Sequence, residues 1–232
     1  MKKISKRTLK AYPDNAYILD QKNRITSIET GLLVTGDDNW LLVKKDSNNS
    51  LISIPKYCRV KNVTISSGRE KFTIVDWPYA NVACSVTALP DNTSRFGNVS
   101  YNSGAVLVYD YASLTLTANP GNIIVKAGFD VANPLPNGDY YLSLADAPHS
   151  AGTGYLDKTK FALTWFFIND SDTLNRYFHT GSVSLGCLTV GVNGTDADIR
   201  RWSDLADLMS RQRMGASSLY SGKLTVKNRP GG

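Results

Sequence analysis

The feature that most constrains the fold is a repeated pattern of short β-forming runs separated by turn-forming residues. Val, Thr, Ile and Tyr recur in these runs, and Gly, Pro, Asn and Asp stand between them. β-Branched and aromatic side chains favour strands because they pack well on a pleated surface. Apolar residues make up 42% of the 232 positions, which is enough for a buried core. The sequence therefore predicts a mainly β protein.

Two parts are expected along the chain. A polar segment with Pro and Gly, residues 88–98, is typical of a domain boundary. We expect residues 1–95 to form a small β-rich N-terminal module of unknown role, and residues 96–232 to form a second domain. Trp40, Trp77 and Tyr79 of the module are either core residues or a surface that binds a sugar or a partner. Strands of the module are predicted at residues 16–19, 31–35, 40–44, 51–55, 59–65 and 71–76.

The second domain should contain further strands and one helix. Residues 147–157 are polar and Gly-rich, which predicts a loop. The helix should begin at Thr195 or Asp196 as N-cap and carry Arg211 and Arg213 in its last turn. Its apolar residues recur at helical spacing, at Ile199, Trp202, Leu205, Ala206 and Met209. Strands are predicted at residues 105–109, 113–117, 123–129, 140–145, 160–168 and 222–226, with the very apolar run 160–168 at the centre.

Charge and hydropathy limit the surroundings of the chain. The net charge of +6 and the pI near 9.1 suit a polyanionic partner such as nucleic acid, an anionic membrane face or the bacterial cell wall. Nucleic acid is not expected, because no dense Lys/Arg tract with interleaved aromatics follows the basic start. No stretch is apolar enough for a membrane span or a secretory signal, so synthesis in the cytoplasm without a signal peptide is expected.

The three cysteines cannot all pair within one chain. Cys58 and Cys84 either form a disulfide or are small buried apolar residues. The chain has no Cys-x-x-Cys motif and only two histidines, so we expect neither a metal nor another cofactor.

One stretch, residues 176–190, combines the groups of a nucleophilic site. It holds His179 and Cys187, and a thiol needs a base such as imidazole to become a nucleophile near neutral pH. Gly186, directly before the cysteine, lets the backbone bend and lets a substrate approach the N–H groups of an oxyanion hole. The His precedes the Cys, an order opposite to that of papain-like hydrolases. The pattern predicts a Cys–His active site; an ordinary polar His and a core Cys are the alternative.

The segment from His179 through Ser184-Leu-Gly-Cys187 resembles the motif of the L,D-transpeptidase family, in which a His precedes Ser/Thr-x-Gly-Cys. Residues 105–117 are similar to the family's opening hairpin, and residues 136–141 to its Pro-x-Gly-x-Tyr/Phe entry to a strand. Leu185 stands where most members have a second His, and Leu188 and Thr189 where an Arg or Asn is usual. The His-to-Cys spacing is also shorter than in most members. The chain thus resembles a divergent branch that includes wall-targeting toxins, the type VI secretion effectors.

This resemblance implies a fold and a set of catalytic roles. The fold would be a β-sandwich with one late amphipathic helix, and residues 96–232 would be the catalytic domain. Cys187 would be the nucleophile and His179 its base, oriented by the backbone carbonyl of Thr180 or of the glycine after it. The N–H groups of Gly186 and Cys187 would stabilise the oxyanion, and Ser184 would position the loop or bond to the His.

The resemblance also implies a substrate, partners and a site of action. The substrate would be the stem tetrapeptide of peptidoglycan, with Tyr177, Gly181 and Ser182 in substrate-binding roles. Transfer to an amine, exchange with a D-amino acid and hydrolysis all stay open. An immunity protein or a secretion-system component would be the partner, and the wall of a target cell the place of action. Two other classes stay open: a non-catalytic β-rich binding or structural module, and another cysteine amidase or endopeptidase of the wall.

Overall fold

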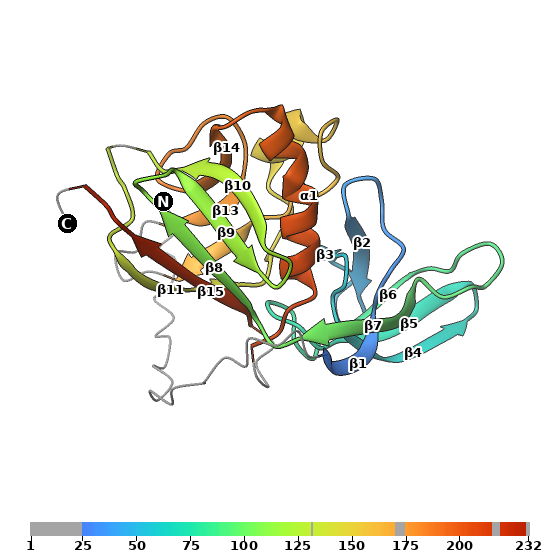
Figure 1. The fold of residues 1–232 in the computed structure, drawn as a ribbon. Coiled ribbons are helices and arrows are strands. Elements are labelled where there is room, and N and C mark those ends of the chain that lie inside the picture. The colour runs from blue at the N-terminus through green and yellow to red at the C-terminus, as the bar shows by residue number, and fades with distance from the viewer. Residues whose placement is uncertain (1–24, 131, 170–174, 215–218, 231–232) are drawn as a thin grey trace.

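The computed structural model of the protein describes residues 25–130, 132–169, 175–214 and 219–230. The fold is mainly β, and one α-helix comes late in the chain, as predicted (Figure 1). The strand predicted at residues 16–19 lies outside the described residues. No helix in the described ranges has the length and apolar character needed to cross a membrane.

The first part of the chain forms a five-stranded antiparallel sheet and a two-stranded ribbon. In the sheet the strand order is β3-β2-β6-β5-β4. Its strands are β2 (Trp40–Lys45), β3 (Leu51–Pro55), β4 (Val60–Ser66), β5 (Arg69–Ile74) and β6 (Ala83–Thr87). The ribbon pairs β1 (Ile25–Leu32) with β7 (Phe96–Asn102), and Leu32 and Phe96 pack into the core of the sheet.

The strand predicted at residues 31–35 is misplaced. β1 already ends at Leu32. The N–H groups of Leu33 and Val34 both donate to the carbonyl of Arg95, at 2.9 and 3.2 Å, and this sharing breaks the ladder. The two cysteines of this part, Cys58 and Cys84, are free and buried, so their interpretation as small apolar core residues is confirmed.

Eight strands of the second part close into a barrel in the order β10-β14-β13-β12-β11-β15-β8-β9. Because β10 and β12 each pair on both sides, two sheets face each other and join at both edges. The expected sandwich is confirmed in this closed form. The strands are β8 (Ala105–Asp110), β9 (Thr115–Asn119), β10 (Ile123–Gly128), β11 (Gly138–Ser143), β12 (Phe166–Asn169), β13 (Tyr177–Thr180), β14 (Leu188–Asn193) and β15 (Tyr220–Lys227).

The helix α1 (Asp196–Ser210) begins as predicted and packs its apolar face on the barrel. The hydroxyl of Thr195 accepts a hydrogen bond from the N–H of Ala197, and the carboxylate of Asp198 accepts one from the N–H of Thr195. Trp202 is fully buried in the barrel core. The placement of two arginines was wrong: Arg211 is the C-cap, and Arg213 follows the helix and reaches the first part of the chain.

The prediction of a central strand over residues 160–168 is wrong for most of that run. Strand begins only at Phe166, and residues before it form successive turns, with the N–H of Thr164 donating to Phe161. The indole of Trp202 also donates to the carbonyl of Phe161, at 2.9 Å. These apolar residues are therefore buried under α1 without being in a sheet. Apolar composition alone does not distinguish such buried turns from a buried strand. A 3-10 helix, η1 (Ser150–Tyr155), likewise lies where only a loop was predicted.

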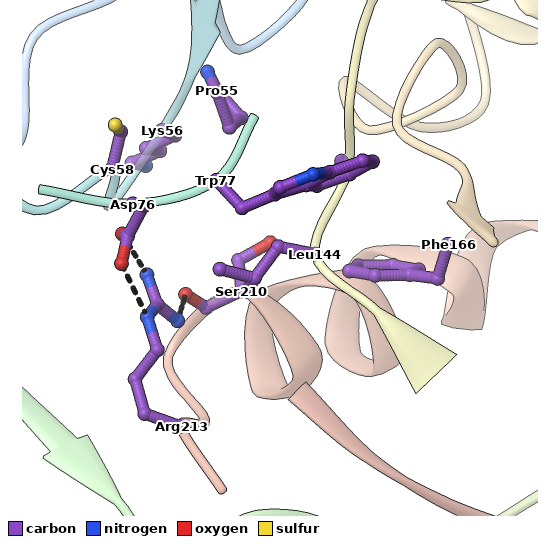
Figure 2. A pocket seen from close by; sticks show the side chains of 10 residues that line it. Pro55, Lys56, Cys58, Asp76, Trp77, Leu144, Phe166, Ser210 and Arg213 are labelled. Carbon is purple, nitrogen blue, oxygen red and sulfur yellow. Dashed lines mark hydrogen bonds and ion pairs between the residues drawn. The ribbon is translucent and has the colours of Figure 1, made fainter. Parts of the chain in front are cut away.

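Buried contacts join the first part of the chain to the barrel. Trp40 of β2 packs against Ala145 and Leu163, so it is a core residue. Nearby, Asp76 accepts hydrogen bonds from the guanidinium groups of Arg59 and Arg213. Figure 2 shows the contact between Asp76 and Arg213 beside a crevice between the two parts of the chain, which Trp77 and Leu144 also line. Figure 1 places α1 on the side of the barrel that faces the five-stranded sheet.

Candidate active site

The predicted site residues lie on strand β13 and in the loop that joins it to the parallel strand β14. β13 and β14 pair with Phe178 opposite Leu188 and with His179 opposite Thr189. Phe178 and Leu188 point into the barrel core, so His179 and Thr189 project from the other face. Cys187 directly precedes β14, and its Sγ accepts a hydrogen bond from the N–H of Tyr177 in β13 at 3.4 Å.

The surroundings of His179 determine which ring nitrogen can act as a base. Its Nδ1 lies 2.8 Å from the carbonyl oxygen of Thr180, and a carbonyl only accepts, so Nδ1 carries the proton. Nε2 therefore holds a lone pair, and it accepts from the hydroxyl of Thr189 at 3.2 Å. The ring stacks on Trp165 at 4.0 Å between centroids. Burial lowers the pKa of His179 to about 4, so the ring is neutral at neutral pH.

Cys187 is a protonated thiol in this resting arrangement. Partial burial raises the pKa of the Cys187 thiol above its ordinary value, and the Tyr177 N–H and the charge of Arg176 offset only part of this. Within the described part of the chain, no hydrogen bond joins Cys187 to His179, because each is engaged by another group. The thiol and the imidazole thus lie at the paired strands β13 and β14 as two neutral groups that no hydrogen bond joins within the described residues.

The loop between β13 and β14 is held by the hydroxyl groups of Ser184 and Tyr155. The Oγ of Ser184 donates to the carbonyl of Cys187 at 2.5 Å and accepts from the N–H of Asp130 at 3.1 Å. Ser184 therefore bonds to the loop and not to the imidazole, the first of the two predicted options. Ser182 is held by the hydroxyl of Tyr155, at 2.7 Å from its Oγ.

Gly186 adopts a φ of +100°, which an L side chain rarely adopts, and this explains a glycine directly before the cysteine. Its carbonyl accepts from Arg176, whose guanidinium also donates to the carbonyl of Asn133 at 2.6 Å. Buried Arg176 thus connects the turn before Cys187 to the loop that precedes β11. Leu185, where the resembled family usually has a His, is 88% exposed.

Sequence reasoning missed a second polar group beside the site. The ring of His149 stacks on Trp165, with centroids 4.5 Å apart and planes 3° apart. Its Nε2 lies 3.1 Å from Asp146, and the hydroxyl of Tyr177 donates to the other oxygen of that carboxylate at 3.3 Å. Burial alone would raise the pKa of Asp146, but the hydrogen bond from His149 lowers it on balance. The Asp-x-x-His spacing of Asp146 and His149 was the only sequence signal for this pair, and such a spacing alone is a weak indicator of a functional site.

No three His, Cys, Asp or Glu side chains lie together as a metal site would require, within the residues that the structure describes.

Acid should destabilise the protein through His179. Its folded pKa of about 4 lies below the ordinary 6.5, so the unfolded chain binds more protons between these values. The contribution of the neutral ring to stability should be fully present above pH 6.5. The free energy of unfolding should then fall by about 3 kcal/mol as the pH drops towards 4. Urea unfolding at stepped pH values measures this, and His179→Gln should flatten the slope in that window. An unchanged slope in the variant would show that another group causes it.

Comparisons with known proteins complete the description. No protein-family model matches the chain, and no curated protein matches it. Among solved structures, the chain is similar to Mycobacterium tuberculosis L,D-transpeptidase 1 at 13% identity and a TM-score of 0.34, covering 74% of this chain and 99% of that one. L,D-transpeptidase 3 of Mycobacterium tuberculosis aligns at 9% identity and a TM-score of 0.34, covering 88% and 83%. An L,D-transpeptidase from Mycobacterium smegmatis aligns at 14% identity and a TM-score of 0.31, covering 74% and 99%.

Proposed function

We propose that this protein is a cysteine acyltransferase or carboxypeptidase of the L,D-transpeptidase kind, with Cys187 as nucleophile and His179 as base. The observation that carries the proposal is the contact between His179 Nδ1 and the Thr180 carbonyl. This contact leaves Nε2 as the accepting nitrogen, on the strand that pairs with β14, which begins directly after Cys187. The backbone carbonyl of Thr180 thus orients the imidazole, as an Asp carboxylate does in Ser–His–Asp triads.

The resting contacts must rearrange for catalysis. Nε2 exchanges the Thr189 hydroxyl for the thiol, takes the thiol proton, and the sulfur attacks the substrate carbonyl carbon. The carbon–nitrogen bond then breaks, and the leaving amine takes that proton from Nε2. The product is a thioester on Cys187, which an amine or water later discharges. The N–H groups of Gly186 and Cys187 are the proposed oxyanion donors, each worth about 10²–10³ in rate.

The substrate is proposed to be the peptidoglycan stem tetrapeptide, cleaved before its terminal D-Ala. Support comes from the resemblance of the segment His179 to Cys187 to the family motif, and from the net charge of +6, which suits a polyanionic wall.

Product analysis tests the function directly. The protein is incubated with purified muropeptides, with and without a free D-amino acid, and products are identified by mass. Loss of D-Ala or its exchange supports the proposal. Cleavage elsewhere in the stem would instead indicate an amidase or endopeptidase, and no product from a folded sample would contradict any wall enzyme.

Delivery into the wall of a target cell is part of the proposal. It is supported only by the resemblance of the motif to the branch that includes secreted toxins, in which an immunity protein or secretion component would be a partner. Directing the chain to the periplasm of a host, with a cytoplasmic control, tests this. Growth arrest by the cytoplasmic form, or by an exported Cys187→Ala variant, would contradict the proposed action in the wall.

A further inference from the structure

The imidazole of His149 and the thiol of Cys187, the candidate nucleophile, both contact Tyr177. The ring of His149 contacts the ring of Tyr177 edge-on, with centroids 4.6 Å apart. The backbone N–H of Tyr177 is the group that donates to the Cys187 sulfur. His149 also stacks on Trp165, which in turn stacks on His179. One indole therefore contacts both histidines of the chain, and Tyr177 contacts both His149 and the sulfur of Cys187.

Asp146 orients His149 so that one nitrogen is left to act as a base. A carboxylate only accepts, so the 3.1 Å contact places the proton of neutral His149 on Nε2. The Tyr177 hydroxyl holds the second carboxylate oxygen at 3.3 Å and prevents rotation of the carboxylate. Nδ1 then carries the lone pair, and within the described ranges no protein group hydrogen-bonds to it.

The two histidines differ in access to solvent. His179 is buried, and its Nε2 already accepts from Thr189. The side chain of His149 is 20% exposed. An acceptor that approaches a thioester on Cys187 comes from solvent, after the first product has left. A base for that acceptor is best placed on the open side, where His149 lies.

We propose that Asp146 and His149 form the acid–base pair that activates the acyl acceptor, an inference that rests on the proposed function. As the acceptor amine or water attacks the thioester carbonyl, Nδ1 of His149 takes one proton from it. The carbon–sulfur bond breaks and the electron pair stays on sulfur. The thiolate of Cys187 then takes up a proton from solvent while His149 releases one. Asp146 stabilises the imidazolium in between.

The test separates acylation from discharge. With a stem tetrapeptide as acyl donor and a free D-amino acid as acceptor, intact-protein mass follows the acyl-enzyme and D-Ala release follows acylation. His149→Asn should release one equivalent of D-Ala and then accumulate the thioester, with discharge slowed about 10²–10⁴-fold. Hydroxylamine, which is unprotonated at neutral pH, should discharge the variant at the wild-type rate because it needs no base.

Two further variants keep the inference falsifiable. Asp146→Asn should show the same selective defect to a smaller extent, and it serves if His149→Asn does not fold. Asp157→Asn changes an exposed Asp outside this group and should behave as wild type. Discharge of both variants to the D-amino acid at the wild-type rate, or equal loss with hydroxylamine, would overturn the inference. If wild-type protein forms no acyl-enzyme, the proposed function fails first and this inference with it.

Discussion

Replacing Cys187 by alanine should abolish turnover of muropeptides and leave the free energy of unfolding nearly unchanged. Loss of a covalent nucleophile removes the reaction path itself and costs on the order of 10⁶-fold in hydrolases. The side chain is half-buried and its only described partner is the Tyr177 N–H, through a weak contact to sulfur. Deleting one such sulfur therefore changes little packing. Product mass and a thermal unfolding curve measure the two quantities on one sample.

Cys84→Ala is the matched control for this variant. It removes a free thiol from the five-stranded sheet, far from the outer face of β13 and β14. Activity should stay at the wild-type level, although loss of a buried core atom lowers stability. Turnover that survives in Cys187→Ala would show that another residue is the nucleophile and would remove the basis of the proposed function.

Replacing Asp76 by alanine should lower the free energy of unfolding by about 3–5 kcal/mol, because it removes the buried carboxylate that two buried guanidinium groups share. Asp76 accepts from the Nε of Arg59 at 2.8 Å and from Nη2 of Arg213 at 2.6 Å. Its side chain is 3% exposed, so water cannot replace it. Urea unfolding measures this loss. We expect one cooperative transition that shifts to lower urea as a whole, because Asp76 and Arg213 join the two parts of the chain.

Asp37→Asn is the control, because it removes an ion pair across the same junction at the surface. Lys160 and Asp37 are 3.7 Å apart and both are largely exposed, so the pair should contribute nothing measurable. Equal urea midpoints for Asp76→Ala and the wild type would show that the buried network does not stabilise the junction. A large effect of Asp37→Asn would show that surface charge does.

Local patterns were sufficient for much of the fold. β3 spans the residues predicted for it, and α1 begins at the predicted cap, Thr195, because alternation and capping are properties of neighbouring residues. The run before Phe166 was misread because apolar composition reports burial, and burial under Trp202 needs no strand. The pairing of His179 with the Thr180 carbonyl also lies between neighbours, so the motif could anticipate it.

The sequence by itself determined that the chain is mainly β and that one loop joins a His to a Gly-Cys pair. Only the tertiary structure decided what surrounds that pair. Asp146 and His149 reach Tyr177 from another loop, and the Trp165 ring that stacks on both histidines follows a turn region. Arg213 likewise meets Asp76 across 137 positions. Such contacts depend on barrel closure and on the packing of α1, which no short-range pattern encodes.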